Sequence, residues 1–572
     1  MTTVSRRSRP TVVVVGAGAA GALTAIHLAR GAGRRSTDID IVLVDPSDRI
    51  GRGVAYSTDD EQHLLNVQAA GMSALPEDPS HFVDWRTRDN PVAPGSSDTA
   101  SDPAAFASRR QFGRYLDETL RDAVEAANGA AGIRQLRARA VAVRRTATGV
   151  AVQTSDGNEL TAEATVIAVG LPSPGTRWAP DALQASAFFV PDPWAPGALD
   201  VVRRDRSGPP DVLLVGTGLT TVDVALSLSD ASSRPDRVIH AISRGGRLPA
   251  EHRPEIRLAA IPDISDWGHD LAGIRRHARR HLASVARSTG DWRPGVDGLR
   301  FQVSSLWERL SEPDRAEFMT RYATRWSSVR HRMAPASAVV LRELRAAGRL
   351  VVGSAEVAAA EPLPTGGLRV TLADGSTRDV GWVVNCTGPQ TDVRALGNPL
   401  LDDLLRSRSG SALAVVSTAG LGFETHHGRL LGSDGASDAP IWTLGAMRRG
   451  ELWESTAVPE LRSQAFALAQ AVLDDVAPLP RQLADGRVVG GRHPVARPRD
   501  PLGMPLSTTA EAAAHYNAGI EKLMRLQNGG DELIRHASEL DPDFALAHAA
   551  MAMLGHEAGV SCDVQASLDA AR

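Results

Sequence analysis

Residues 12–21 read Val-Val-Val-Val-Gly-Ala-Gly-Ala-Ala-Gly, an apolar β-branched run that leads into a glycine-rich turn. The run predicts a buried strand, and the pattern of residues 22–29 predicts a helix. In such a turn Gly16 permits the tight bend, Gly18 lets the backbone approach a pyrophosphate, and Gly21 lets the helix pack closely on the strand. The arrangement is typical of Rossmann-type units, whose helix N-termini bind phosphates.

An acidic residue follows at the place where such a unit needs one. Residues 39–44 predict the next strand, and Asp45 stands at its end. A carboxylate at this position accepts hydrogen bonds from a ribose diol. The first unit is therefore predicted to bind a dinucleotide through Gly16, Gly18, Ala20, Gly21 and Asp45.

A second fingerprint spans residues 212–221, which read Val-Leu-Leu-Val-Gly-Thr-Gly-Leu-Thr-Thr, with the small Thr221 in place of the third glycine. The next strand, predicted for residues 238–242, ends in Ser243 and Arg244 rather than in an acid. Because a carboxylate would repel a 2′-phosphate and a guanidinium beside a hydroxyl would bind it, we predict NADPH rather than NADH at this unit. The alternative is that Arg244 is a solvated surface arginine. The predicted contacts are Gly216, Gly218, Thr221, Ser243 and Arg244.

Three further strands also run into glycine, at residues 164–170, 380–389 and 441–445. Each would bring backbone close to one large cofactor, which predicts that the chain leaves its first domain, builds a second nucleotide domain and returns. Two dinucleotides in one protein usually exchange electrons. The predicted cofactor contacts from these returns are Gly170, Thr387, Gly388 and Gly445.

A helix start follows the last return. In residues 453–462, Ser455 or Thr456 would cap the helix, and Pro459 and Glu460 suit its first turn. A helix N-terminus here suits the negative charge of a reduced isoalloxazine, so Thr456 joins the predicted cofactor contacts.

These patterns predict an α/β fold with two Rossmann-type dinucleotide-binding domains, the first of them discontinuous, and a C-terminal α-helical tail. The predicted divisions are a first nucleotide domain at 10–205 and 379–478, a second with a helical Arg- and Trp-rich insertion at 206–378, a linker at 479–505 and the tail at 506–572. We also expect an exposed loop at 89–103 and a small β meander at 140–157.

The tail resembles a tetratricopeptide array. Residues 510–526 and 532–540 have helical periodicity, Asp541-Pro542 breaks the pattern, and an Ala-rich helix restarts at 544–550. A plain helical hairpin is an equally good interpretation. Since the tail has room for about two units and three or so are needed to stand alone, we expect it to pack on the body, pair with another chain or stay loosely ordered.

Composition excludes several function classes. The net charge of −4 over 572 residues gives no sign of a nucleic-acid or membrane-surface partner. Lys522 is the single lysine, so the core domains lack the amine for Schiff-base chemistry. Cys386 and Cys562 form no Cys-x-x-Cys pair, which excludes a dithiol relay, and two cysteines cannot build a four-thiolate zinc site. No other metal site is predicted.

The sequence also predicts a location. Arg6-Arg7 before an apolar stretch superficially resembles a twin-arginine leader, but cleavage there would destroy the first fingerprint, so we expect none. No stretch is long and apolar enough to span a bilayer. A cytoplasmic, reducing setting is expected.

A family resemblance covers residues 10–475. The segments that carry it are 51–56, 63–67, 110–116, 291–293, 330–335 and 453–459. Together with the two fingerprints, they resemble the two-dinucleotide-binding flavoproteins, which include class B flavin monooxygenases, and more narrowly the bacterial FAD/NAD(P)-binding protein family. One branch is similar to amino-acid N-oxygenases, including aspartate N-monooxygenases. The resemblance implies FAD and NADPH as cofactors and adds Gly53, Leu65 and Asn66 to the cofactor contacts.

The activity that the resemblance implies is NADPH-dependent oxygenation of a small substrate through a flavin C4a-hydroperoxide, for example N-oxygenation of an amino acid such as aspartate in a biosynthetic pathway. Residues 188–194 lack the Gly and His of the Baeyer–Villiger fingerprint, which speaks against that chemistry. An acidic substrate needs forked cationic partners, for which Arg293, Arg330 and Arg332 are candidates, with His331 as a proton carrier. The alternative for each of them is a structural salt bridge or an ordinary surface position.

Two other hypotheses remain open. The first is a flavin-dependent NAD(P)H reductase or dehydrogenase that delivers electrons to a partner protein docked on the tail. The second is a flavin-bound scaffold whose function lies in the tail, in which case NADPH would never bleach the flavin.

Overall fold

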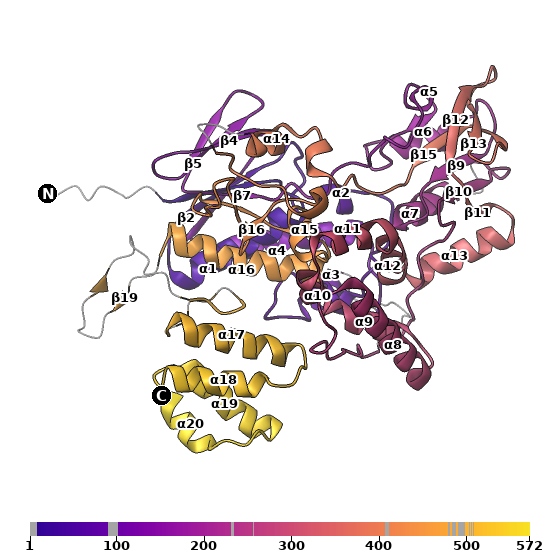
Figure 1. The fold of residues 1–572 in the computed structure, drawn as a ribbon. Coiled ribbons are helices and arrows are strands. Elements are labelled where there is room, and N and C mark those ends of the chain that lie inside the picture. Colours follow the sequence, from indigo (N-terminus) through magenta and orange to yellow (C-terminus); the bar gives the residue numbers. More distant parts are fainter. Residues whose placement is uncertain are drawn as a thin grey trace.

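The computed structural model describes residues 9–89, 101–229, 234–255, 257–406, 411–478, 481–482, 488–489, 498–502, 504, 506 and 508–571. Two sheets and their covering helices lie at the upper left and upper right of Figure 1, with a helical insertion below them and the tail helices at the lower left. Most of the expected loop at 89–103 and of the expected linker at 479–505 falls outside the described residues.

The first sheet combines strands from distant parts of the chain. β1 (Thr11–Val15) pairs in parallel with β2 (Ile39–Val44) and β7 (Ala164–Ile167). β3 (Ala131–Leu136) adds to β2, and β18 (Ile441–Thr443) adds to β7, also in parallel. An antiparallel edge is formed by β17 (Arg429–Leu430) and β16 (Thr425–His426).

Helices and a small sheet bury the two faces of the first sheet. One face packs on α1 (Ala19–Arg35), α4 (Arg109–Ala126), α3 (His81–Asp89) and α16 (Val458–Val476). The other face packs on α14 (Pro399–Leu405) and on the predicted meander, which is β4 (Ala140–Arg145), β5 (Val150–Thr154) and β6 (Glu159–Ala162). The continuous valine run of β1 is therefore explained, because a parallel strand covered on both faces needs no polar alternation.

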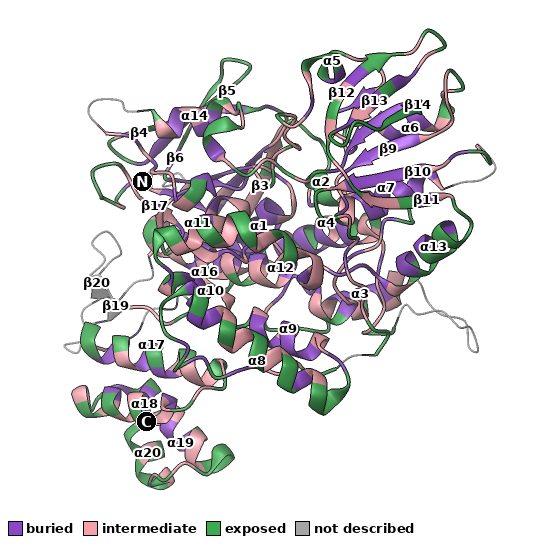
Figure 2. Ribbon diagram, turned by 45° about the vertical axis from the view of Figure 1, so that its right-hand side comes forward, coloured by how far each residue is buried: buried purple, intermediate pink, exposed green. Residues whose placement is uncertain are grey.

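The second sheet is parallel throughout, in the order β11-β10-β9-β15-β8. Its strands are β8 (Phe189–Val190), β9 (Val212–Val215), β10 (Ile239–Ser243), β11 (Leu350–Ser354) and β15 (Trp382–Asn385). One face packs on α6 (Ala198–Arg204), α7 (Leu219–Leu228) and α13 (Pro335–Ala346). The other packs on α5 (Asp181–Gln184) and an antiparallel sheet of β12 (Val357–Pro362), β13 (Leu368–Leu372) and β14 (Thr377–Val380). The strands of both sheets are largely buried in Figure 2.

The pairing corrects the predicted division of the chain. β15 was expected to return to the first domain, but it lies beside β9 in the second sheet, with Trp382 opposite Val212. β8, predicted within the first domain, pairs with β15. The boundaries at 205/206 and 378/379 are therefore wrong. An apolar strand that runs into glycine looks the same in either sheet, so the pattern could not assign it.

The helical insertion falls where it was predicted. It consists of α8 (Leu271–Thr289), α9 (Arg293–Arg300), α10 (Val303–Arg309), α11 (Glu312–Arg321) and α12 (Ala323–Arg330). Its tryptophans form a core with Trp453 of the first unit, since the Trp307 and Trp453 rings stack at 5.1 Å. Arg300 donates two hydrogen bonds of 2.7 Å to Glu460 in the first turn of α16. The insertion is thereby joined to the first unit.

Short elements complete the body. They are α2 (Gly53–Tyr56), η1 (Ala69–Gly71), η2 (Val393–Ala395), η3 (Thr418–Gly420), η4 (Gly445–Arg448), α15 (Arg449–Leu452), β19 (Arg481–Gln482) and β20 (Val488–Val489). Among the described residues, no helix is both long and apolar enough to cross a bilayer.

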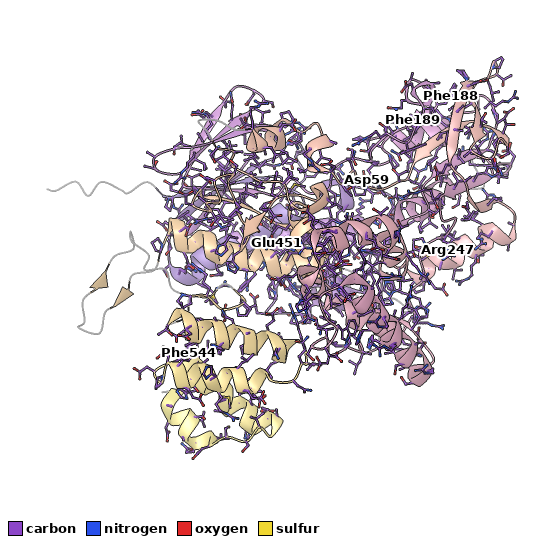
Figure 3. All side chains as sticks on the ribbon, viewed as in Figure 1. Asp59, Phe188, Phe189, Arg247, Glu451 and Phe544 are labelled. Carbon is purple, nitrogen blue, oxygen red and sulfur yellow. The ribbon has the colours of Figure 1, made fainter. Side chains whose placement is uncertain are left out.

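Four helices form the tail: α17 (Ala510–Met524), α18 (Gly530–Leu540), α19 (Ala545–Ala558) and α20 (Val564–Ala571). They have a core of their own that contains Phe544, which is labelled in Figure 3. Its ring packs on the Tyr516 ring, with 5.0 Å between the centroids. The tail also contacts the body, because the amide of the fully buried Gln302 donates to the Arg525 carbonyl at 3.3 Å. The helical prediction is confirmed, and the tetratricopeptide identity stays a prediction.

Candidate cofactor and substrate site

The glycine turn of the first unit has the geometry that its sequence predicts. Gly16 has a φ of +101°, and its N–H donates to the Val44 carbonyl at 2.8 Å. A Cβ on Gly21 would lie 1.9 Å from the Gly16 oxygen, so only glycine lets α1 start this close to the strand. Gly18 has a φ of −69° and needs no left-handed conformation. Its lack of a side chain instead leaves room beside the turn.

Asp45 lies beside this turn at the carboxyl end of β2. Its Oδ2 accepts a 2.8 Å hydrogen bond from the Ala17 N–H, and its Oδ1 accepts one of 2.8 Å from the Ser47 N–H. A carboxylate offers about four lone-pair sites, so two remain for other donors. Asp45 is half-buried, and it is placed to accept from a ribose held above the turn.

Two segments that carry the family resemblance fold onto the same edge. A Cβ on Gly18 would lie 3.3 Å from the Gly53 Cα, so the two glycines face each other. In the second segment, Leu65 is buried in the core of the first unit. The Asn66 carbonyl accepts a 3.0 Å hydrogen bond from Nε2 of His252. Of the predicted contacts, Gly53 and Leu65 therefore lie against the first unit. Asn66 contacts the segment that leads into the helical insertion.

The second glycine turn has the same design with one substitution. Gly216 has a φ of +114°, and a Cβ there would lie 2.1 Å from the Cys386 oxygen. Thr221 is fully buried, and its hydroxyl donates to the Gly216 carbonyl at 2.7 Å, which holds the helix on the turn in place of a third glycine. Beside Gly218 a Cβ would meet nothing within 4 Å. Open space therefore adjoins the N-terminus of α7.

The strand-end pair proposed for a 2′-phosphate lies at the tip of β10. The Ser243 hydroxyl is 2.8 Å from the Thr217 hydroxyl and accepts a 3.0 Å hydrogen bond from the Gly246 N–H. Arg244 is exposed, and within the described part of the chain its guanidinium makes no ion pair. An exposed, unpaired guanidinium at this position is available to an anion.

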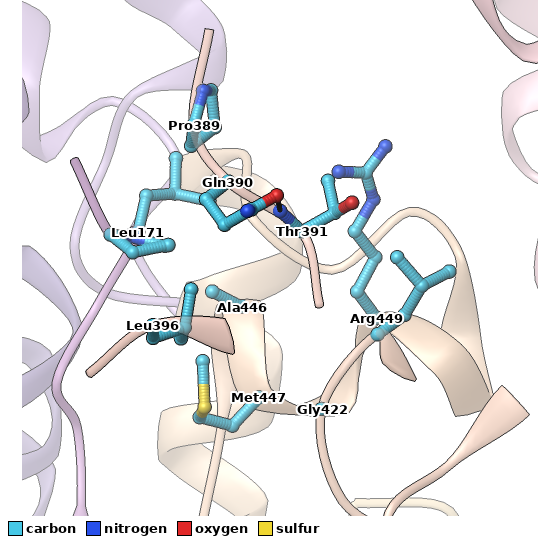
Figure 4. Close-up of a pocket in the computed structure, with 11 residues that line it drawn as sticks. Leu171, Pro389, Gln390, Thr391, Leu396, Gly422, Ala446, Met447 and Arg449 are labelled. Atoms are coloured by element: carbon cyan, nitrogen blue, oxygen red, sulfur yellow. Dashed lines mark hydrogen bonds between the residues drawn. The ribbon is translucent and has the colours of Figure 1, made fainter. Parts of the chain in front are cut away.

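The carboxyl ends of the two sheets meet at a pocket. The chain passes between the sheets through residues 170–176 and 387–392, where Gly170 and Gly388 have positive φ and open space on their Cβ side. The pocket is narrow and partly open to solvent, and about 20 Å³ of it is accessible to a water molecule. Figure 4 shows the side chains that line it. Its lining residues include Leu171, Pro389, Gln390, Thr391, Met447 and Arg449. Three of the strand ends predicted to approach a cofactor therefore converge here, and Thr387 and Gly388 line an adjoining opening.

The helix that follows the last strand into glycine, residues 441–445, has a different cap from the one predicted. The cap of α16 is Ala457, without a side-chain hydrogen bond, so neither Ser455 nor Thr456 caps it. Ser455 points inward instead, is 1% exposed, and its hydroxyl has no partner among the described residues. Gly445, with a φ of +68°, donates its N–H to the Gln464 side chain at 2.9 Å. The uncapped first turn leaves backbone N–H groups for a ligand.

A buried charged group lies behind the pocket wall. Glu454 accepts a 2.8 Å hydrogen bond from the Trp326 indole, and its carboxylate is 3.7 Å from the Arg330 guanidinium. Burial opposes ionisation of Glu454, yet the Arg330 guanidinium and the hydrogen bond from Trp326 hold its pKa below the usual value. Burial and the adjacent Arg330 lower the pKa of His331 to about 4, so this imidazole is neutral at pH 7. The positive charge of Arg449, which lines the pocket, also interacts electrostatically with Glu454 and His331.

Two more of the predicted arginines lie in the same region. Arg332, 3% exposed, pairs with Asp297 through one nitrogen, while its Nε and Nη1 have no hydrogen-bond partner among the described residues. Arg330 likewise keeps Nε and Nη2 without one. Arg293 donates through Nε to the Glu251 carbonyl at 2.9 Å and through Nη1 to Asp291 at 3.0 Å. Arg330 and Arg332 therefore have unpartnered donors, whereas Arg293 forms a structural ion pair.

Sequence reasoning missed two members of this region. His252 is half-buried beside Arg332, and this partial burial together with that guanidinium lowers its pKa to about 3. Glu454 lies within residues 453–459, one of the segments that carry the family resemblance, but only the fold brings it close to Arg330. No periodicity or spacing could have linked residues so far apart in the chain.

Residues 13–172 match the family model described as FAD-NAD(P)-binding. This match confirms the predicted class of cofactor. No curated protein matches the chain. Among solved structures, the reduced form of ornithine hydroxylase from Pseudomonas aeruginosa is 14% identical, with a TM-score of 0.51 over 82% of this chain and 100% of that chain. The cadaverine monooxygenase of the desferrioxamine pathway from Erwinia amylovora, bound to FAD, is 12% identical, with a TM-score of 0.50 over 86% and 100%. The shared architecture confirms the resemblance at the level of the fold.

Proposed function

We propose that the chain is an NADPH-dependent flavin monooxygenase that oxygenates a small substrate. The main support for this proposal is that the carboxyl ends of the two sheets meet at one pocket. Both crossover segments line this pocket, together with Met447 and Arg449. Two dinucleotides bound at those edges would meet there. When bound, FAD would supply the oxygenation chemistry: with two electrons from NADPH, one atom of dioxygen would go to a nucleophile and the other would leave as water.

The first unit fits FAD. The open side of Gly18 and the N-terminus of α1 would take the pyrophosphate, and Asp45 would accept from a ribose. The free N–H groups at the start of α16 and the unpartnered Ser455 hydroxyl suit the polar edge of the isoalloxazine. The remaining proposed contacts are Gly16, Ala20, Gly21, Gly53, Leu65, Asn66, Gly170, Thr387, Gly388, Gly445 and Thr456.

The second unit fits NADPH through Gly216, Gly218 and Thr221 at the turn and Ser243 and Arg244 at the strand tip. We predict that Arg244→Ala raises the Kd for NADPH about tenfold, because one charge-assisted contact to the 2′-phosphate is lost. The Kd for NADH, which lacks that phosphate, should not change. Isothermal titration with both nucleotides measures this, and an equal loss for both would contradict the assignment.

The substrate proposed is an anionic amino acid such as aspartate, oxygenated at its nitrogen. Arg330 and Arg332 hold buried guanidinium groups with unpartnered N–H donors, which an acidic substrate's carboxylates would satisfy. His331 is neutral at pH 7, so it would not repel the ammonium group of the substrate, although its low pKa makes it a weak proton carrier. The two solved neighbours named above as an ornithine hydroxylase and a cadaverine monooxygenase act on amines, which supports an amino nitrogen as the target.

The test is NADPH consumption by the purified protein against a panel of amino acids and diamines, with mass spectrometry for an added oxygen atom. The proposal predicts substrate-dependent oxidation and an N-oxygenated product for an acidic amino acid. Oxygenation of a basic amine only would overturn the assignment of Arg330 and Arg332. Release of hydrogen peroxide with every candidate would overturn the monooxygenase proposal itself.

A reductase that passes electrons to a protein partner is the second candidate. The tail favours it, because Met524, Leu526 and Met553 are 78%, 74% and 66% exposed and would suit a protein contact. This candidate predicts that a one-electron acceptor sustains rapid NADPH oxidation, and that removing the apolar side chains slows transfer only to the partner. We place both functions in the cytoplasm, on the composition of the chain.

A further inference from the structure

The two nucleotide units are joined by a buried polar network at some distance from the pocket. The first unit contributes Asp60, His63 and Arg109, and the second contributes Arg203 of α6 with Asp223 and Ser227 of α7. We call these six residues the interdomain latch. His63, Asp223 and Ser227 are 2%, 4% and 4% exposed, whereas Asp60, Arg109 and Arg203 are partly exposed.

The latch has two sets of contacts, which we call its arms. In the first arm, the hydrogen bonds determine which group donates and which accepts. The Ser227 hydroxyl donates to Asp60 at 2.6 Å, and Arg203 donates to the same carboxylate oxygen at 2.8 Å. The Ser227 oxygen must therefore accept from Nε2–H of His63, 2.7 Å away. Nδ1 of His63 then accepts from the Thr58 hydroxyl at 2.8 Å. Burial lowers the pKa of His63, so the imidazole is neutral and holds this tautomer.

An ion pair forms the other arm. Arg109 lies 2.9 Å from the Asp223 carboxylate, with side chains 17% and 6% exposed. The Trp194 ring of the second unit packs edge-on against His63 at 5.6 Å and lies 5.9 Å from the Arg109 guanidinium. Arg109 and His63 are themselves held together, because the Arg109 N–H donates to the His63 carbonyl at 2.8 Å. Both arms thus start from one small region of the first unit.

Both arms end on α7, the helix whose N-terminus adjoins Gly218. Asp223 and Ser227 are one helical turn apart and so lie on one face of it. At a rise of about 1.5 Å per residue, Asp223 is roughly 7–8 Å along the axis from the glycine turn. A helix is rigid over this length, so a contact at its far end sets the direction of its N-terminus.

We propose that the interdomain latch positions the second unit, by holding α7 against the first, so that a nucleotide bound at Gly216–Gly218 is aimed at the pocket between the sheets. None of the six latch residues is among those that line the pocket, so they are positioning residues. The consequence for hydride transfer rests on the proposed function, but the positioning itself does not.

The positioning can be measured on the full-length protein without any nucleotide. Cys386 is buried, so Cys562→Ser leaves no reactive thiol, and Glu125→Cys with Arg345→Cys places one spin label on an exposed position of each unit. Pulsed electron spin resonance then gives the distribution of distances between the units. Ser227→Ala and Arg109→Gln are expected to widen or shift this distribution.

Two matched variants control the experiment. Arg110→Gln removes a neighbouring charge that pairs with Glu61 inside the first unit, and Ser229→Ala removes a hydroxyl that bonds to its own helix. Both should keep the parent distribution. If Ser227→Ala and Arg109→Gln also keep it while melting at the parent temperature, the latch proposal is overturned. A loss of folding in Arg109→Gln leaves the milder Ser227→Ala to decide.

A kinetic readout separates the latch from the proposed chemistry. A misplacement of about 1 Å between reacting groups can cost on the order of 100-fold in rate. We therefore expect Arg109→Gln to slow flavin reduction by NADPH by up to that factor, with an unchanged Kd for NADPH. If the parent protein is not reduced by NADPH at all, the proposed function fails, while the distance measurement still tests the latch.

Discussion

Gly18→Val is expected to yield a folded protein without FAD, and Gly218→Val a folded, FAD-containing protein that no longer binds NADPH. Both glycines have negative φ, −69° and −84°, so valine causes no backbone strain at either. At Gly18 the new Cβ would lie 3.3 Å from the Gly53 Cα, which needs a shift of a few tenths of an ångström. At Gly218 it would meet nothing within 4 Å. The side chains instead occupy the space where a pyrophosphate would approach the helix.

The size of the effect follows from the contacts that are blocked. Hydrogen bonds to a charged group are worth about 1.5–3 kcal/mol each, so losing two weakens binding roughly 100- to 10,000-fold. Flavin content from the visible spectrum and nucleotide titration measure the two losses separately. Gly353→Val, in strand β11 with no left-handed backbone and nothing within 4 Å of the new Cβ, is the control for the effect of a new valine. Equal loss of FAD in both fingerprint variants would contradict the assignment of one dinucleotide to each unit.

Glu454→Ala is expected to lower the free energy of unfolding by about 3–5 kcal/mol, because it leaves the buried Arg330 guanidinium without its counter-charge. Both side chains are less than a tenth exposed. Replacing the pair together, as Arg330→Met with Glu454→Leu, should recover most of the loss, since no lone charge stays buried. Denaturant titration of the single and double variants measures the coupling.

An exposed pair provides the comparison for this prediction. Glu77 and Arg30 form an ion pair with side chains 44% and 31% exposed, so Glu77→Gln should cost at most about 1 kcal/mol. The pH dependence gives a second check. Because the pKa of Glu454 is lowered in the folded protein, its stabilisation is complete above pH 4.5 and is lost as the pH falls below that value. A Glu454→Ala effect that grew on acidification would contradict this sign.

Local patterns predicted the parts of the molecule that depend on neighbouring residues. The β1–α1 and β9–α7 turns, the meander, the insertion and the tail helices all follow from periodicity and from glycine geometry at Gly16 and Gly216. In each case the residues that decide the conformation are adjacent in sequence. The strand pairing of β8 and β15 is different, because either sheet could accept an apolar strand that ends in glycine.

The site residues also fall into two groups, those that the sequence could predict and those that only the fold brings together. The sequence named Arg330, His331 and Arg332 as a group because they are adjacent, and two of them keep unpartnered donors in the structure. It could not find Glu454 or His252, whose relation to these arginines is created by packing of the insertion against α15 and α16. It also predicted Ser455 or Thr456 as the helix cap, since a hydroxyl residue before a helix usually caps it. Ala457 is the cap instead, and the Ser455 side chain is buried.

The central claim is that FAD on the first unit faces NADPH on the second. Anaerobic mixing of the purified full-length protein with NADPH, followed by visible absorbance, tests it most directly. The account predicts that the protein is yellow as isolated or after reconstitution with FAD, and that NADPH bleaches the flavin band. A colourless protein that takes up no FAD, or a bound flavin that NADPH never reduces, would contradict it.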